Sequence, residues 1–295
     1  MASGIVLVDK PWGLSSHGAV ARVRKALGTK KVGHAGTLDP AATGLLVLGV
    51  NAGTRLLTYL VGLDKSYTAV MRLGYETTTD DAEGERVGEG SPSLETLTDQ
   101  SVLGILDQFR GEIDQVPSTY SAIKVEGKRA YDLARSGEEV ELQSRPVSIT
   151  RLEAGPITRG EGYCDVELVV DCSSGTYIRA LARDIGRALG VGGHLVALRR
   201  TRVGPFDVHH AVVPEDVAES QIMGLAEAAG RVMPVVTLSP QEALDISHGR
   251  PIRTEGWSQS GPVAAIEGDS GKLRAILESS QGRSRILMGV PDSER

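Results

Sequence analysis

The sequence predicts an α+β protein with a largely antiparallel mixed sheet flanked by helices, followed by a small β-rich domain. Strand-like and helix-like segments are mixed without regular βαβ alternation, which favours this class. The 295 residues are 40% hydrophobic and 24% charged, as in ordinary folded domains. The texture changes near Pro234, where short strands broken by Gly, Ser and Pro begin. We therefore expect a large domain over residues 1–233 and a small one over residues 234–295.

The first part of the chain is expected to form a strand, a capped helix and a second strand. Residues 5–8 are strand-like, and Ser15 or Ser16 can cap a helix that ends at Gly28. The apolar residues of this helix recur at helical spacing. Residues 67–73 alternate between apolar and polar or small side chains, which predicts a half-buried strand.

Later elements follow the same patterns. A helix is expected from Ser93 to Phe109, and a strand over residues 121–125 enters a tight turn and then a helix that ends at Gly137. Further on we expect paired strands over 147–157 and 164–172, an amphipathic helix over 176–189, and C-terminal strands over 263–266, 273–277 and 284–288.

Charge is distributed unevenly along the chain. The net charge of −6 argues against binding to nucleic acid through bulk charge. Residues 1–35, however, hold six basic side chains against one acidic, whereas residues 76–114 hold eleven acidic against two basic. Smaller basic clusters are Lys124, Lys128 and Arg129, and Arg199, Arg200 and Arg202. These clusters either form a local basic face that attracts phosphate or are solvated surface.

Several classes of protein are excluded or disfavoured. The sequence has no run of about 18 apolar residues, which excludes a membrane-spanning helix. The first residues lack the basic flank and cleavage site of a signal peptide. Cys164 and Cys172 lie in a strand-like segment without CxxC spacing, which predicts two reduced core cysteines in a cytosolic protein. No histidine has neighbours at metal-ligand spacing.

Residues 33–44 carry one carboxylate, one imidazole and three glycines. The glycines permit backbone angles and close approaches that side chains resist. Pro40 fixes its own φ and pushes Asp39 toward an extended conformation. Asp39 is thus presented on a stiff turn just before the apolar run 45–48. Alone, the segment is also consistent with a simple Asp-Pro turn.

Four further segments accompany this loop in a fixed order. They contain Lys10-Pro11-Trp12-Gly13, Lys65-Ser66-Tyr67, Gly175-Thr176-Tyr177-Ile178-Arg179 and His194-Leu195. Together the five segments resemble the bacterial TruB family, the tRNA pseudouridine-55 synthases. The resemblance covers about residues 4–212, and residues 243–252 more weakly resemble the entrance to a PUA-like RNA-binding domain.

The resemblance implies an isomerase that converts uridine to pseudouridine at position 55 in the T-loop of tRNA, without a cofactor. It implies a cytoplasmic monomer with no obligatory protein partner. Asp39 would be the catalytic carboxylate, attacking either C6 of the base or C1′ of the sugar. Arg179 would orient and charge-balance Asp39, and Tyr67 would pack on the target base and assist proton transfer. Simpler alternatives are a surface arginine and a half-buried strand tyrosine.

The resemblance also implies residues that contact RNA. His34 would enter the RNA loop in place of extruded bases, although it could instead stabilise its own loop by a hydrogen bond. Lys10 would support the catalytic loop or bind a phosphate. The Ser15-Ser16 pair is interpreted as a helix cap, because no triad partner is in view. The remaining expected contacts are Lys30, Lys31, Tyr177, Leu198, Arg199 and Arg200, together with an RNA-clasping insertion near residues 120–145.

Two other functions compete with the isomerase. The first is a non-catalytic tRNA-binding protein or tRNA-folding chaperone with the same fold. Intact Asp39, Tyr67 and Arg179 argue against it, since a protein without turnover has no chemical need for all three. The second is an unrelated hydrolase using Asp39. Such enzymes commonly use a pair of carboxylates, and the sequence does not indicate a second carboxylate that would pair with Asp39.

Overall fold

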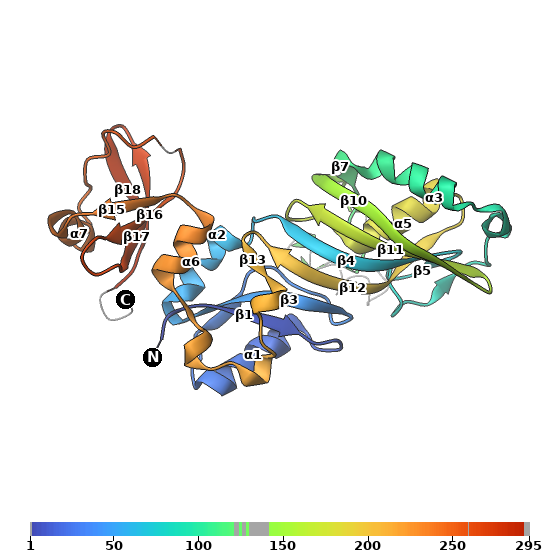
Figure 1. The fold of residues 1–295 in the computed structure, drawn as a ribbon, viewed down its shortest axis with the longest axis horizontal. Coiled ribbons are helices and arrows are strands. Elements are labelled where there is room, and N and C mark those ends of the chain that lie inside the picture. Colours follow the sequence, from blue (N-terminus) through green and yellow to red (C-terminus); the bar gives the residue numbers. More distant parts are fainter. Residues whose placement is uncertain (1, 121–123, 126–127, 130–141, 259, 292–295) are drawn as a thin grey trace. The chain divides into compact units, whose positions relative to one another are not determined.

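A computed structural model describes residues 2–120, 124–125, 128–129, 142–258 and 260–291 (Figure 1). The chain divides into two compact units. The first comprises Met1–Pro40, Gly44–Gly62 and Val203–Arg295, and the second comprises Ala41–Thr43 and Leu63–Arg202. Among the described residues, no helix is both long enough and apolar enough to cross a membrane.

In the first unit, a small antiparallel sheet is buried on both faces. Strand β1 (Gly4–Lys10) pairs with β3 (Ala42–Val50), from Gly4 opposite Val50 to Lys10 opposite Gly44. Strand β14 (Met223–Gly224) extends β1, and β2 (Val32–His34) pairs with β3. Side chains of both faces are buried, so most of β1 and most of β3 consist of apolar residues without a polar face.

Helix α1 (Ser16–Leu27) covers one face of this sheet, with Val20 and Val23 in a cluster that includes Val6 and Val8. Its predicted ends are confirmed. The side chain of Ser15 accepts a hydrogen bond from Gly18 N at 3.0 Å, and Gly28 has the left-handed φ of 62° that favours glycine after a helix.

Short elements complete the first unit before the C-terminal sheet. They are two turns after β3, η1 (Asn51–Arg55) and α2 (Leu57–Leu60), three 3₁₀ turns, η4 (Val208–His210), η5 (Pro214–Asp216) and η6 (Glu219–Gln221), the short strand β13 (Phe206–Asp207), and helix α6 (Leu225–Val232).

The end of the chain forms a separate four-stranded sheet in the order β15-β16-β17-β18. Its strands are β15 (Val235–Leu238), β16 (Val263–Glu267), β17 (Leu273–Ser280) and β18 (Arg283–Gly289). Helix α7 (Pro240–Ser247) joins its core through Ala243 and Ile246. The three predicted strands are confirmed, and β15 and α7 are additions. The boundary after residue 233 stays a prediction, although the sheet begins just beyond it.

The second unit is built on five neighbouring strands of the ten-stranded sheet, drawn on the right of Figure 1. Strand order is β12-β4-β11-β10-β7. The strands are β4 (Lys65–Leu73), β7 (Gly111–Gln115), β10 (Arg145–Gly160), β11 (Tyr163–Cys172) and β12 (Gly193–Val203). Helices α3 (Asp99–Leu106) and α5 (Ile178–Ala188) contribute Val102, Leu106, Leu181 and Ile185 to the core on this sheet. Cys164 and Cys172 are buried and free, as predicted.

One predicted helix is wrong in its extent. The segment from Ser93 to Phe109 is not continuous: it forms a 3₁₀ turn, η2 (Pro92–Thr96), then α3, then η3 (Asp107–Phe109). Leu97 is extended, and the Thr98 side chain caps α3 by accepting from Ser101 N at 3.1 Å. A capping residue inside an apolar pattern restarts the helix, and periodicity alone does not show this.

The region of the expected RNA-clasping insertion is described only in part. Strands β8 (Lys124–Val125) and β9 (Lys128–Arg129) pair with each other. The predicted helix ending at Gly137 lies outside the described residues. Before this region, β5 (Glu76–Thr77) pairs with β6 (Arg86–Val87) and frames the loop over residues 78–85.

Candidate active site

The Asp39 loop joins β2 to β3 in the first unit, and its carboxylate is half-buried. Gly36 and Gly44 have φ angles of 88° and 100°, so two of the three glycines have the conformation that favours glycine. Gly33 differs because it lies in β2. A Cβ there would stand 3.1 Å from Leu57 Cδ1, so a larger residue would require a small shift of that side chain.

Helix α1 fixes one side of this loop through Ser16, which is buried. The Ser16 hydroxyl donates to Leu38 O at 2.9 Å and accepts from Leu38 N at 2.8 Å. Both backbone polar groups of the residue before Asp39 are therefore satisfied by one side chain. Such pairing inside a protein holds the backbone in place, because an unmade buried hydrogen bond is costly.

Lys10 fixes the other side. It is fully buried, at 0% exposure, and its Nζ donates to Leu14 O at 2.6 Å, Pro11 O at 3.1 Å and Pro40 O at 3.3 Å. Gly13 N also donates to Pro40 O at 2.9 Å. The three carbonyls take up the three protons of an ammonium group. Lys10 thus ties the first turn of the chain to the residue after Asp39, which favours loop support over phosphate binding.

His34 ends β2 and stands beside a second histidine. The rings of His17 and His34 meet edge to face, with centroids 5.4 Å apart and planes at 86°. His17 is exposed on α1 and His34 is half-buried. The pair places aromatic surface next to the loop that carries Asp39. It is compatible with contact to unstacked RNA bases.

Arg179 lies in the first turn of α5 in the second unit and is 6% exposed. Its Nη1 donates to Thr79 O at 2.9 Å and to Asp81 Oδ2 at 3.0 Å, and its Nη2 donates to Tyr120 O at 2.9 Å. The alternative of a solvated surface arginine is therefore wrong. Asp81, which the sequence did not single out, is an ionic partner of this guanidinium.

A second buried ion pair stands one helical turn further on. Arg183 Nη1 meets Asp80 Oδ2 at 3.0 Å, and Arg183 Nη2 donates to Val116 O at 2.7 Å. Burial raises the pKa of Asp80 above its ordinary range, and the positive charge of Arg183 opposes that shift. Adjacent aspartates thus meet arginines at i and i+4 of one helix. Removing one partner of such a buried pair strongly destabilises the folded protein, because the other charge stays buried without compensation.

The other candidate residues of the second unit lie on its sheet and helix. Tyr67 is 7% exposed on β4, and Leu198 on β12 packs against the same core cluster. Tyr177 is the N-cap residue of α5. Its backbone forms two hydrogen bonds with the Gln115 side chain: Tyr177 N donates to Gln115 Oε1 at 2.8 Å, and Gln115 Nε2 donates to Tyr177 O at 3.1 Å. Asp39 belongs to the first unit, so its predicted pairing with Arg179 stays a prediction.

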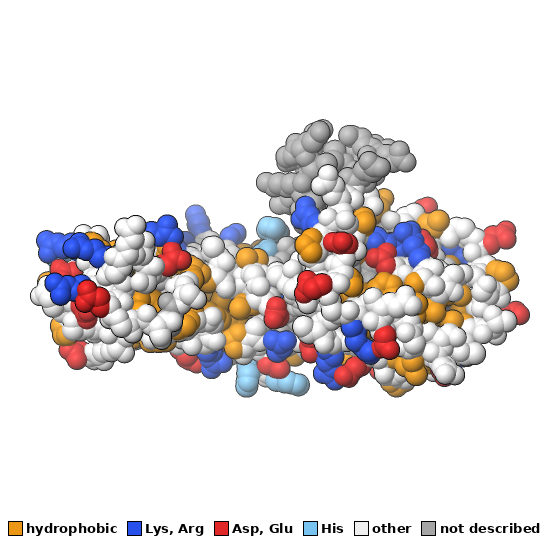
Figure 2. Space-filling view, turned by 90° about the horizontal axis from the view of Figure 1, so that it is seen from above, with side chains coloured by type: hydrophobic (Ala, Val, Ile, Leu, Met, Phe, Trp, Pro, Cys, Tyr) orange, Lys and Arg blue, Asp and Glu red, His pale blue; other side chains and the backbone are white. Residues whose placement is uncertain are grey.

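The basic candidates differ in exposure. Lys30 and Lys31 are exposed beyond the end of α1, and Arg199 is half-buried. Arg200 is 1% exposed and is therefore not available as a phosphate contact in this structure. Its charge adds to the effect of burial in lowering the pKa of Lys65 to about 8. The face drawn in Figure 2 carries Lys and Arg interspersed with Asp and Glu.

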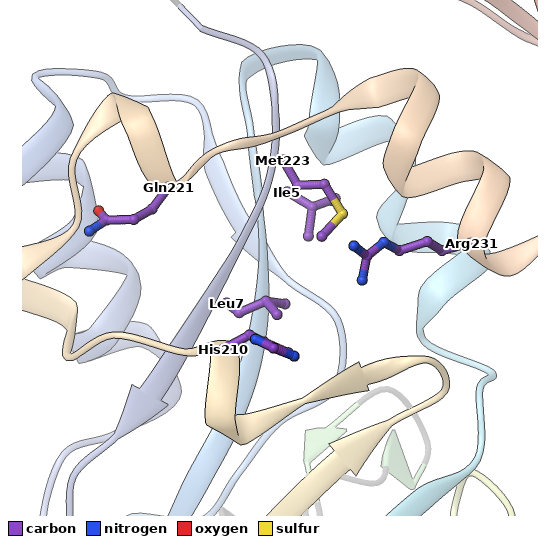
Figure 3. A pocket seen from close by; sticks show the side chains of 6 residues that line it. All are labelled: Ile5, Leu7, His210, Gln221, Met223 and Arg231. Carbon is purple, nitrogen blue, oxygen red and sulfur yellow. The ribbon is translucent and has the colours of Figure 1, made fainter.

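Two other features bear on chemistry. Among the described residues, no group of three or more His, Cys, Asp or Glu side chains is placed to hold a metal ion. A pocket of about 220 Å³ opens at the start of β1, with Arg231 directed toward Met223 over apolar Ile5 (Figure 3). Its two lining residues on β1, Ile5 and Leu7, lie five and three residues before Lys10, and none of its lining residues belongs to the Asp39 loop.

Known protein families and named proteins are similar to most of this chain. Residues 24–178 match the TruB family pseudouridylate synthase N-terminal domain, and residues 179–240 match the tRNA pseudouridylate synthase B C-terminal domain. The protein named tRNA pseudouridine synthase B in Arthrobacter sp. strain FB24 is 49% identical over 306 residues, covering 100% of this chain and 99% of that protein. Its namesake in Paenarthrobacter aurescens strain TC1 is 52% identical over 301 residues, covering 99% of this chain and 96% of that protein.

Structural similarity agrees. A chain in the crystal structure of a Cbf5-Nop10-Gar1 complex matches with a TM-score of 0.71 and 26% identity, over 98% of this chain and 84% of that chain. The family match and the named relatives define a pseudouridine synthase, an isomerase. The chain belongs to the TruB family. The predicted fold class and the predicted family are both confirmed.

Proposed function

We propose that this pseudouridine synthase converts uridine 55 in the T-loop of tRNA, with Asp39 as its catalytic carboxylate. The observation that carries the proposal is the anchoring of the Asp39 loop by Ser16 and Lys10. Anchoring positions a nucleophile before the substrate arrives, so little orientational entropy of the nucleophile is lost when the substrate binds. The named relatives supply tRNA as the substrate, and the non-catalytic alternative is not favoured.

The reaction rearranges atoms already present in the nucleotide. The Asp39 carboxylate bonds to C6 of the base or C1′ of the sugar, and the N1–C1′ bond breaks. The base turns, C5 bonds to C1′, the bond to Asp39 is released, and the C5 proton leaves as N1 gains one. We therefore expect no cofactor. A carboxylate suits this role because it can add and later leave.

Other residues have distinct roles in this proposal. Arg179 orients Asp39, while Asp81 holds the guanidinium in place and so limits the cost of ordering it. Tyr67 and Leu198 pack on the extruded base, and Tyr177 and His34 contact the RNA near it. The exposed Lys30 and Lys31, with Arg199, contact phosphates. The enzyme acts in the cytoplasm as a monomer, and residues 234–295 form a PUA-like RNA-binding domain.

The proposal is tested by mapping pseudouridine in an unmodified tRNA transcript after incubation with the purified chain. Carbodiimide labelling and primer extension should give a single new stop that reports position 55. A transcript with cytidine at position 55 should give none. Tight binding without any pseudouridine would instead support the chaperone function, and a stop elsewhere in the transcript would contradict the assigned position.

A further inference from the structure

Trp12 is the most exposed large hydrophobic side chain in the described part of the chain, at 71%. The sequence has only two tryptophans and is 4% aromatic. The other, Trp257, is half-buried and packs against the core of the C-terminal sheet. A scattered exposed leucine needs no explanation. An indole held in water is different, because tryptophan combines a large apolar face with low conformational freedom and is enriched where proteins recognise partners.

The backbone on both sides of Trp12 is anchored. Buried Lys10 donates to Pro11 O before Trp12 and to Leu14 O after it. Gly13, at a φ of 78°, turns the chain so that its N–H reaches Pro40 O at 2.9 Å. A Cβ on Gly13 would meet no atom within 4 Å, so this turn faces open space. Trp12 therefore projects from a rigid turn. The residue after it, Gly13, is hydrogen-bonded to Pro40, which follows Asp39.

The surroundings of this turn favour a nucleic acid as the partner. The same segment begins α1, and its His17 meets His34 edge to face. The rings of Trp12, His17 and His34 thus come from the Asp39 loop or from segments hydrogen-bonded to it. Unstacked bases in RNA loops are recognised by such faces, and the extrusion of one base leaves its neighbours without a stacking partner. An exposed indole beside the loop can replace the lost stacking.

We propose that Trp12 stacks on an unpaired loop base adjacent to the uridine that enters the Asp39 site. This inference rests on the proposed function, which supplies the RNA loop, and it assigns a substrate-binding role to a residue outside the chemistry. Stacking on tryptophan is tolerant of base identity. Trp12 therefore contributes to affinity for the open loop and only weakly to the choice of its sequence.

The two tryptophans make the inference directly measurable. In Trp257→Phe combined with Asp39→Asn, Trp12 is the sole tryptophan, so it can be excited selectively, and the RNA stays unconverted. Titration with a T-arm stem-loop RNA should quench the Trp12 emission to saturation, since a stacked base contacts the indole. The matched duplex, closed into a helix without the loop, should quench little when bound.

Affinity and rate give a second readout. Trp12→Ala should weaken binding of the stem-loop about tenfold, whereas Trp12→Phe should recover most of it. Single-turnover rates at saturating RNA should change much less. The exposed position of Trp12 predicts an unchanged thermal midpoint, which checks that the variants fold.

Two results would overturn the inference. One is saturated RNA binding, followed by filter retention, with no change in Trp12 emission. The other is a Trp12→Ala variant that binds the stem-loop as tightly as its parent, or that changes only self-association of the chain. Both leave pseudouridine formation by the unaltered enzyme intact. Failure of the proposed function would appear separately, as absent pseudouridine in the mapping assay.

Discussion

The Asp39 loop and the start of α5 hold their functional groups in opposite ways. Around Asp39 the contacts are made to backbone: Ser16 satisfies Leu38, and Lys10 binds three carbonyls. Around Arg179 and Arg183 the contacts include carboxylates, Asp81 and Asp80. The difference follows from the charge being held. The Asp39 loop is positioned through the backbone on either side of Asp39, whereas a buried guanidinium needs a negative partner to offset its desolvation.

The largest expected effect comes from Asp39 itself. Asp39→Asn keeps the shape but removes the nucleophile, so the single-turnover rate should fall by at least about a thousandfold. Affinity for tRNA should persist, because the phosphate and stacking contacts remain. The measurement is pseudouridine formed against time at saturating tRNA, with filter binding alongside. A variant that keeps a tenth of the activity would show that Asp39 is only a turn residue.

The next largest effect is expected at Lys10, which tests the backbone contacts that hold the Asp39 loop. Lys10→Met removes the donor to three carbonyls and should lower the free energy of unfolding by about 2–4 kcal/mol. It should also reduce the catalytic rate by loosening Pro40. Chemical denaturation measures the stability. The matched control is Lys25→Met, an exposed lysine of α1, which should shift stability by no more than about 0.5 kcal/mol.

The exposed basic residues should affect binding more than chemistry. Charge reversal at Lys30 and Lys31 should raise KM about tenfold, with little change in kcat, and should flatten the dependence of affinity on salt. Arg151→Glu is the control, since Arg151 is exposed on β10 and is not among the expected contacts. Equal effects of the two changes would mean that Lys30 and Lys31 are ordinary solvated surface.

The last expected effect, which does not touch activity, is the pH dependence of stability at Lys65. Burial lowers the pKa of Lys65 from 10.5 to about 8 in the folded protein. Between these values the unfolded chain binds a proton that the folded chain does not, so Lys65 makes stability rise with pH there. The stability of the unaltered protein relative to Lys65→Met should therefore increase from pH 8 to pH 10.5. A constant difference across this range would contradict the depressed pKa.

Much of the fold could be predicted because its signals are local. The cap and stop of α1, the alternation of β4, the β10–β11 pair and the amphipathic α5 are each encoded within a dozen or so neighbouring residues. The break in the helix predicted from Ser93 was missed because Thr98 caps a new helix inside a continuous apolar pattern. Strand β15 was missed because it is only four residues long.

The candidate site shows a sharper limit. The motif segments led to Asp39, Tyr67 and Arg179, but not to Asp81, which meets Arg179 across 98 residues of sequence. Asp80 and Asp81 were counted in an acidic stretch because charge counting does not show which side chains are buried. Two adjacent aspartates, and two arginines spaced i and i+4 on one helix, were the signal. The burial of Lys10 and Arg200 was likewise invisible, since charged residues are mostly exposed.

The central proposal is that Asp39 and Arg179 act together on the uridine, with Arg179 orienting Asp39. A double-mutant cycle of Asp39→Asn and Arg179→Lys tests it most directly, with single-turnover pseudouridine formation as the measured rate. Arg179→Lys alone should be slowed at least about tenfold with tRNA affinity unchanged, because an ammonium cannot replace a planar, two-pronged donor. The double mutant should then be no slower than Asp39→Asn alone, since residues that act as a unit are not additive. Rate losses that multiply, or a Lys variant that loses affinity while keeping its single-turnover rate, would contradict the account and make Arg179 a separate contact to the RNA.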